Sequence, residues 1–83
     1  MYKLIFTSKA EKSFASLDKK WQLKIYKVFQ SLKENPLKGK KLQGELSSLY
    51  SFRVWPYRII YTIQKEKITL FIVEIGHRQG VYK

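Results

Sequence analysis

The residues best suited to chemistry in this sequence are three arginines that stand apart from a background of lysines. The 83 residues include 17 Lys and Arg against 6 Asp and Glu, which gives a formal net charge of +11. The other cations are all lysines, while Arg53, Arg58 and Arg78 lie in the second half of the chain. Arginine presents a planar fork of donors that fits a phosphate group. The composition therefore predicts a polyanionic partner, either a nucleic acid or an acidic protein segment.

Composition excludes several kinds of catalytic site. The chain has no cysteine and one histidine, and its six acidic residues are scattered, so the sequence offers no set of metal ligands. It also contains no glycine-rich phosphate loop and no GxSxG turn. We therefore expect no metal and no cofactor, and neither nucleotide hydrolysis nor serine-hydrolase chemistry.

A cation-rich site without a metal is still competent to cleave RNA. RNA carries its own nucleophile, the 2′-OH, which can attack the adjacent phosphate in line. The protein then has to position the strand, take a proton, neutralise the phosphorane and protonate the leaving 5′-oxygen. Because DNA has no such internal nucleophile, RNA is favoured as the substrate. A non-catalytic RNA-binding module and a surface that is basic for solubility alone are the alternatives.

The first half of the chain predicts a strand and two helices. Residues 2–7 are short, aromatic and β-branched, as strands are. A short helix is expected to begin at Ser8, with Glu11 in the capping-box relation. A longer helix is expected from an Asp18 N-cap to about Asn35, where Asn-Pro stops it. The apolar positions of the longer helix share one face: Trp21, Ile25, Val28, Phe29 and Leu32.

The second half predicts a loop and three strands. A loop with two glycines and three lysines is expected at residues 37–46. Beyond it, residues 49–55 and 57–64 alternate with period two, as in a hairpin. Residues 68–75 form the most apolar strand, which we expect to be central and to end at Gly76.

These elements predict an α+β fold of order β-α-α-β-β-β, in which a helical hairpin packs on one face of a small, mostly antiparallel sheet. The length suits a single domain covering residues 1–83. No apolar run approaches the roughly 18 residues needed to span a bilayer, and none has the form of a signal peptide. We therefore expect a cytoplasmic protein without a membrane partner.

The period-two phase also predicts which face of the sheet carries the arginines. Arg53 and Arg58 flank the hairpin turn and are out of phase with the apolar positions, so we expect them on the face that the helices leave open. The short tail after the last strand is expected to bring His77, Arg78 and Tyr82 to the same edge.

Two segments carry a resemblance to a known family. They are Tyr-Ser-Phe-Arg-Val-Trp-Pro-Tyr-Arg-Ile-Ile-Tyr at 50–61 and Ile-Val-Glu-Ile-Gly-His-Arg-Gln-Gly-Val-Tyr at 72–82. These segments resemble the RelE/ParE toxin superfamily, and most of all the RelE-type toxins of type II toxin–antitoxin modules. The likeness covers nearly the whole chain, including Lys-Leu-Gln-Gly at 41–44, and implies a single RelE-like domain.

The resemblance implies a function and roles for individual residues. RelE-type toxins are mRNA interferases, metal-independent endoribonucleases that cut messenger RNA in the ribosomal A site, and each has a cognate antitoxin, here expected to be acidic. By position, Arg58 corresponds to the sheet arginine that stabilises the phosphorane. Arg78 corresponds to the tail arginine that protonates the leaving group or stabilises charge, and Tyr82 to a tyrosine that stacks on the base or assists proton transfer. Arg53 and His77 stand at positions that are often basic.

The resemblance leaves two questions open. Ser51 stands where some members have a second lysine for proton transfer, so the general base is not identified. ParE-type members share the fold but inhibit DNA gyrase, and they are not expected to need the basic tail. The lysines expected to bind RNA or the ribosome are Lys20, Lys24, Lys27, Lys38, Lys40 and Lys41.

Overall fold

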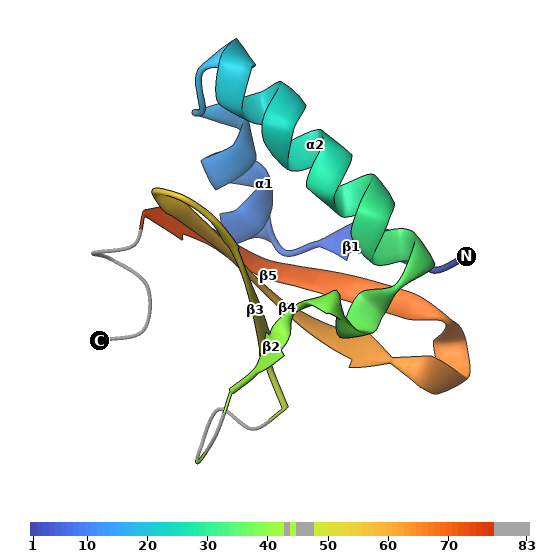
Figure 1. Ribbon diagram of the computed structural model, residues 1–83. Helices are drawn as coiled ribbons and strands as arrows, with labels where there is room; N and C mark the ends of the chain where they lie inside the picture. Colours follow the sequence, from blue (N-terminus) through green and yellow to red (C-terminus); the bar gives the residue numbers. More distant parts are fainter. Residues whose placement is uncertain (43, 45–47, 78–83) are drawn as a thin grey trace.

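The computed structural model describes residues 1–42, 44 and 48–77, which form two α-helices on one face of a five-stranded sheet (Figure 1). The expected α+β architecture, a helical hairpin on a small and mostly antiparallel sheet, is confirmed. The elements in chain order are β1 (Lys3–Phe6), α1 (Ser8–Ala15), α2 (Lys19–Glu34), a 3₁₀ turn (Pro36–Lys38), β2 (Lys40–Lys41), β3 (Tyr50–Val54), β4 (Tyr57–Gln64), a 3₁₀ turn (Lys65–Lys67) and β5 (Thr69–His77).

The strand order in the sheet is β1-β5-β4-β3-β2. β1 pairs with β5 in parallel, and all the other neighbours pair antiparallel. β5 is an interior strand, as its apolar sequence predicts, although β4 occupies the middle position. The sequence also predicts that Gly76 ends this strand, but β5 continues through Gly76 to His77 because Gly76 lies opposite Arg58 in the ladder.

The segment expected to be a loop contains an edge strand instead. Lys40 pairs with Ser51 and Lys41 pairs with Tyr50, which makes β2 the last strand of the sheet. A strand of two residues is too short to produce a detectable period-two pattern. Its position therefore comes from tertiary contacts and not from its own sequence.

Thr7 caps α1 and ties it to β5. The Thr7 side chain accepts a hydrogen bond from the backbone N–H of Ala10 at 3.1 Å and donates one to the carbonyl of Val73 at 2.7 Å. The helix begins at Ser8 as expected, but Thr7 is its N-cap, so the expected capping box of Ser8 with Glu11 is wrong. Asp18 occupies the N-cap of α2 as expected, but its side chain makes no capping hydrogen bond.

The core lies between α2 and the middle of the sheet. Trp21 and Val28, which belong to the predicted apolar stripe, are only partly buried, whereas the rest of the stripe is fully enclosed. The most deeply buried large side chains are Tyr61, Phe29, Ile25, Leu32, Ile59, Leu70 and Ile72.

Tyr61 anchors the start of β2 to this core. Its hydroxyl donates a hydrogen bond to the carbonyl of Pro36 at 2.6 Å and accepts one from the N–H of Gly39 at 3.0 Å. A Cβ on Gly39 would lie 2.3 Å from the Tyr61 hydroxyl, so only glycine allows so close an approach. This contact holds Lys40 and Lys41 in place beside β3.

The environment of Tyr61 predicts a loss of stability at high pH. Burial raises the pKa of Tyr61 from 10.0 to about 12. Between these values the unfolded chain releases the proton and the folded protein keeps it, so the stability present below pH 10 is lost as the pH rises. We expect the free energy of unfolding to fall by about 1.4 kcal/mol per pH unit from this group. Urea unfolding at pH 9 to 12 measures the slope.

Tyr61→Phe is the matched control for this prediction. It removes the titrating hydroxyl while the ring still fills the core, so the pH slope of the variant should be flatter than that of the wild type. The variant should also be less stable at pH 7, by about 1–3 kcal/mol, because the Gly39 N–H loses its acceptor. If the free energy of unfolding falls equally steeply with pH in the two proteins, Tyr61 is not the group responsible for the loss of stability.

Candidate functional site

Arg53 and Arg58 lie directly opposite each other on β3 and β4. Their neighbours Phe52 and Ile59 form the next pair, and both of these contribute to the core beneath the helices. Because opposed side chains share a face and successive pairs alternate, both arginines lie on the face that α1 and α2 leave open. This is the face that the sequence pattern predicts for them. Arg53 is exposed and Arg58 is half-buried.

The two arginines line a cleft of about 440 Å³ at the edge of the sheet. The described residues that line it include four cations and no carboxylate. Like charges placed directly opposite each other weaken an antiparallel pair, and a bound anion relieves that repulsion. The cleft is therefore suited to a phosphate group. Its lining residues are Lys38, Lys40, Leu42, Ser51, Phe52, Arg53 and Arg58.

β2 supplies cations to both of its faces. Lys40 lies opposite Ser51 and therefore joins the arginines, whereas Lys41 lies opposite Tyr50 and lines a different cleft. Lys38, just before this strand, donates a hydrogen bond to the hydroxyl of Ser31 on α2. The predicted RNA-binding lysines of this segment are thus divided between two sites.

His77 lies at the same end of the sheet as Arg58, but its ring packs on the helix side. It pairs with Tyr57, one step along the ladder from the pair of Gly76 and Arg58. Its ring meets Tyr57 edge-on, with ring centroids 5.8 Å apart, and Tyr57 meets Trp21 of α2 in the same way at 5.2 Å. His77 is therefore near the arginine cleft without lining it. Arg78 and Tyr82 lie outside the described residues.

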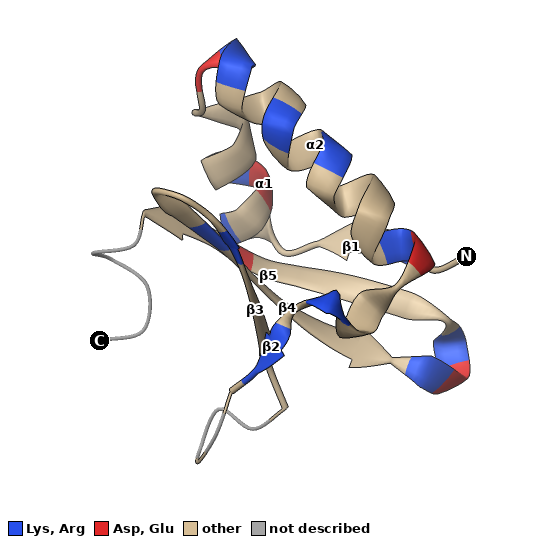
Figure 2. Cartoon of the chain, viewed as in Figure 1, with Lys and Arg blue, Asp and Glu red and all other residues tan. Residues whose placement is uncertain are grey.

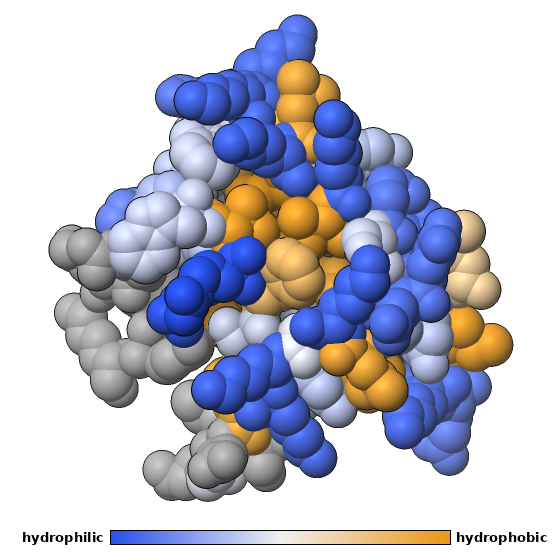
Figure 3. All heavy atoms as spheres, in the orientation of Figure 1, coloured by the Kyte–Doolittle hydropathy of each residue, from blue (hydrophilic) through white to orange (hydrophobic). Residues whose placement is uncertain are grey.

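The lysines expected to bind RNA on α2 form a separate basic surface (Figure 2). The Nζ atoms of Lys20 and Lys24 lie 5.7 and 4.9 Å from the ring centroid of Trp21, within range of a cation–π interaction. Lys27 is exposed nearby on the same helix. In the view of Figure 3, hydrophilic side chains surround a patch of apolar surface between α2 and the strands.

Sequence reasoning did not identify Lys65, Lys67 and Tyr50 as possible binding residues. The two lysines belong to a turn between strands, and Tyr50 follows the alternation of an ordinary core residue. The sequence feature that could have indicated a binding site is the pair of lysines on either side of Glu66. The turn is so short that both lysines must lie at the same end of the sheet.

Two further properties of the described residues bear on function. Within residues 1–42, 44 and 48–77, no three His, Asp or Glu side chains are grouped so that they could hold a metal ion. Over the same residues, neither helix combines the length and the apolar character that crossing a membrane requires.

Comparison with known proteins identifies the family. A family model described as the ParE toxin of the type II toxin–antitoxin system, parDE, matches residues 4–82. The chain belongs to the RelE/ParE toxin superfamily. It is a toxin of a type II toxin–antitoxin system, and the RelE-type resemblance found in the sequence is confirmed.

Individual relatives of this toxin are RelE-type proteins. Toxin RelG of Mycobacterium tuberculosis is 31% identical over 84 residues, which cover 99% of this chain and 97% of the relative. The toxin–antitoxin complex RelBE2 of the same organism contains a chain with 32% identity and a TM-score of 0.84, over 93% of this chain and 98% of that one. The isolated E. coli RelE toxin is 25% identical with a TM-score of 0.83, over 93% and 84% of the two chains.

Proposed function

We propose that this toxin is a metal-independent endoribonuclease that cleaves messenger RNA on the ribosome. The observation that carries the proposal is the directly opposed pair of Arg53 and Arg58 on the open face of the sheet, with Lys40 beside them. Cations held in this way can bind a scissile phosphate and neutralise the charge that the phosphorane gains. The 2′-OH of the RNA supplies the nucleophile, so the products carry a 2′,3′-cyclic phosphate.

The two arginines have different surroundings, which supports different roles. Arg58 is half-buried on β4, which is paired with strands on both sides. Arg53 is exposed on β3. The described part of β2 pairs only with Ser51 and Tyr50, so it does not extend alongside Arg53. We assign the phosphorane contact to Arg58, because a side chain held at low dielectric interacts more strongly with developing charge. Arg53 holds the substrate phosphate from the exposed side.

Proton transfer is assigned to the end of the chain. The described residues that line the arginine cleft include no histidine and no carboxylate, the side chains that most often act as general bases. His77 lies in the ladder one residue beyond Gly76, the partner of Arg58. From the resemblance, Arg78 protonates the leaving group or stabilises charge, and Tyr82 stacks on the base or assists proton transfer.

An acidic antitoxin is the second partner in this proposal. The RelE-type chain of M. tuberculosis that resembles this one comes from a toxin–antitoxin complex. The formal charge of +11 suits an acid-rich segment, and apolar surface surrounded by hydrophilic side chains suits an amphipathic one (Figure 3). Because the substrate is messenger RNA on ribosomes, the toxin acts in the cytoplasm.

Incubation of the toxin with translating ribosomes tests the function. We expect new mRNA ends, mapped by primer extension, in the presence of ribosomes and not on the same mRNA alone. Cleavage should survive chelation of free divalent ions at a level that leaves the ribosomes intact, because cations of the protein take the place of a metal at the phosphate.

Inhibition of DNA gyrase is the second candidate function, since the matching family model is named for ParE toxins. A supercoiling assay with the same protein preparation separates the two candidates. Intact mRNA together with blocked supercoiling would overturn the ribonuclease proposal, whereas cleaved mRNA with normal supercoiling supports it.

A further inference from the structure

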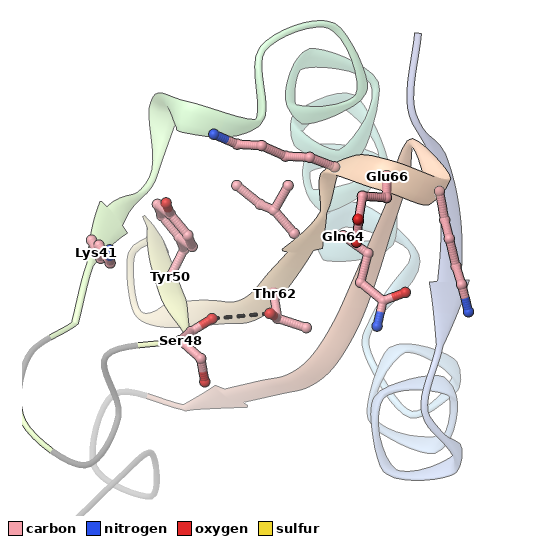
Figure 4. A pocket seen from close by; sticks show the side chains of 9 residues that line it. Lys41, Ser48, Tyr50, Thr62, Gln64 and Glu66 are labelled. Atoms are coloured by element: carbon pink, nitrogen blue, oxygen red, sulfur yellow. Dashed lines mark hydrogen bonds between the residues drawn. The ribbon is translucent and has the colours of Figure 1, made fainter.

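A second and larger cleft lies toward the other end of β4, next to the turn that leads into β5 (Figure 4). Its volume is about 680 Å³, against about 440 Å³ for the arginine cleft. In Figure 4, Lys41, Ser48 and Tyr50 lie on one side and Gln64 and Glu66 on the other. The residues that line the cleft are Lys41, Ser48, Tyr50, Thr62, Ile63, Gln64, Lys65, Glu66 and Lys67.

The cleft forms because β4 is longer than the strand beside it. The pairing of β3 with β4 ends at Tyr50 and Tyr61, so the last three residues of β4 extend beyond the described part of β3. The chain before β3 is held at this point, since the hydroxyl of Thr62 donates a hydrogen bond to the carbonyl of Ser48 at 2.9 Å. The edge of β4 therefore forms one wall of an open groove.

The charge of the cleft favours an anionic ligand. Lys41 approaches from β2, and Lys65 and Lys67 approach from the turn on the opposite side, against the single carboxylate of Glu66. All three lysines are exposed. Lysines on two sides of an open groove can follow the backbone of a charged chain that passes between them.

Tyr50 distinguishes this cleft from a merely basic surface. Its ring stacks on Tyr61, with centroids 5.5 Å apart and an interplanar angle of 20°, and Tyr61 is itself fully buried and hydrogen-bonded at its hydroxyl. The ring of Tyr50 is thus held in a fixed orientation at the wall of the cleft. A fixed aromatic ring beside lysines is the arrangement with which proteins bind single-stranded nucleic acid, one base stacking on the ring.

We propose that this cleft is a second RNA-binding site, in which Lys41, Lys65 and Lys67 contact phosphates and Tyr50 stacks on a base. Its far end, at Gln64, lies about 20 Å from Arg58, six residues farther along β4 at about 3.3 Å each. The site rests on the proposed function in that its RNA belongs to the ribosome complex cleaved at the arginine cleft. It holds that RNA without taking part in the reaction.

Charge reversal in the turn tests the site. We expect Lys65→Glu/Lys67→Glu to weaken binding to ribosomes by about tenfold or more, and to reduce the slope of log affinity against log salt by about two. The matched control is Lys12→Glu/Lys19→Glu, which makes the same charge change at exposed positions on the helices. Glu66→Gln should have the opposite effect and strengthen binding.

Substitution of Tyr50 tests the stacking separately. Tyr50→Phe keeps a ring and should bind ribosomes as the wild type does, whereas Tyr50→Leu should bind about tenfold more weakly. Thermal unfolding of both variants identifies any loss of fold. The lysine variants, whose side chains are exposed, test the site independently of that result.

Two arms of the experiment identify the RNA. Equal loss of affinity for vacant and mRNA-programmed ribosomes means that the cleft holds ribosomal RNA, and loss restricted to programmed ribosomes means that it holds the message. The site is overturned if the turn variant binds as the control does, or if it loses affinity only for an acidic peptide. If the wild type binds ribosomes but leaves mRNA uncut, the proposed function fails while this site stands.

Discussion

Arg58→Ala should lower the single-turnover rate constant for mRNA cleavage by about 10²–10³-fold, the scale for removing one contact to a developing oxyanion. Arg58 is half-buried on an interior strand and faces the opposed Arg53. The phosphorane carries more charge than the substrate phosphate, so an arginine in this position acts mainly in the transition state. Affinity for ribosomes should change little, because we expect most phosphate contacts to come from Lys20, Lys24 and Lys27 on α2 and from the lysines of β2 and of the turn after β4.

Three variants make this prediction specific. Arg58→Lys keeps the charge but loses the planar fork, so its rate should lie between those of Arg58→Ala and the wild type. Arg53→Ala removes an exposed cation and should affect binding more than the rate at saturation. Lys12→Ala, on the outer side of α1, should leave both quantities unchanged. If Arg58→Ala cleaves at the wild-type rate, the arginine cleft is a binding surface and the catalytic assignment is wrong.

The position of the arginines is the part of the site that the sequence predicts well. A shift of one residue in a strand moves every side chain to the other face, so the alternation of Phe52 and Val54 with Arg53 determines where Arg53 points. The same reasoning places Arg58 on the open face, since Ile59 and Tyr61 are in the core. A helical hairpin beside three strands then leaves few topologies to consider.

The position of His77 shows where the same reasoning fails. A glycine near the end of an apolar strand usually marks its end, so the sequence predicts that His77 lies in a short tail after the strand. In the structure Gly76 stays in the ladder, and the alternation of β5 then carries the ring of His77 to the helix side, against Tyr57. Whether a glycine ends a strand or stays within it depends on the pairing with the neighbouring strand and not on the local sequence.

The second cleft could not be predicted because its parts come from distant segments. Lys41 belongs to a strand that exists only through its pairing with β3, and Lys65 and Lys67 belong to a turn. Tyr50 follows the core alternation, and only the structure places its ring between the buried Tyr61 and an open groove. Each residue has an ordinary local role, and the site arises from the unequal lengths of β3 and β4.

A single 2′-deoxy nucleotide at the scissile position of the mRNA should abolish cleavage. In the proposed mechanism the 2′-OH is the only nucleophile, and the protein stabilises the phosphorane that it forms. Without this hydroxyl no in-line attack on the adjacent phosphate takes place, whatever the arginines contribute. The measurement uses ribosomes programmed with an mRNA that carries the substitution at the mapped cleavage site. The same ribosomes without toxin give the background level of mRNA ends.

The matched control places the 2′-deoxy nucleotide one position farther along the same mRNA. This substrate should be cleaved at the rate of the all-ribose mRNA, because the altered sugar now lies outside the reacting group. The cut ends should carry a 2′,3′-cyclic phosphate, which phosphatase leaves intact until acid opens the ring. A 3′-hydroxyl end, or cleavage at the deoxy position, would mean that water is the nucleophile. Another group would then have to activate the water molecule, because an arginine does not act as a base at neutral pH.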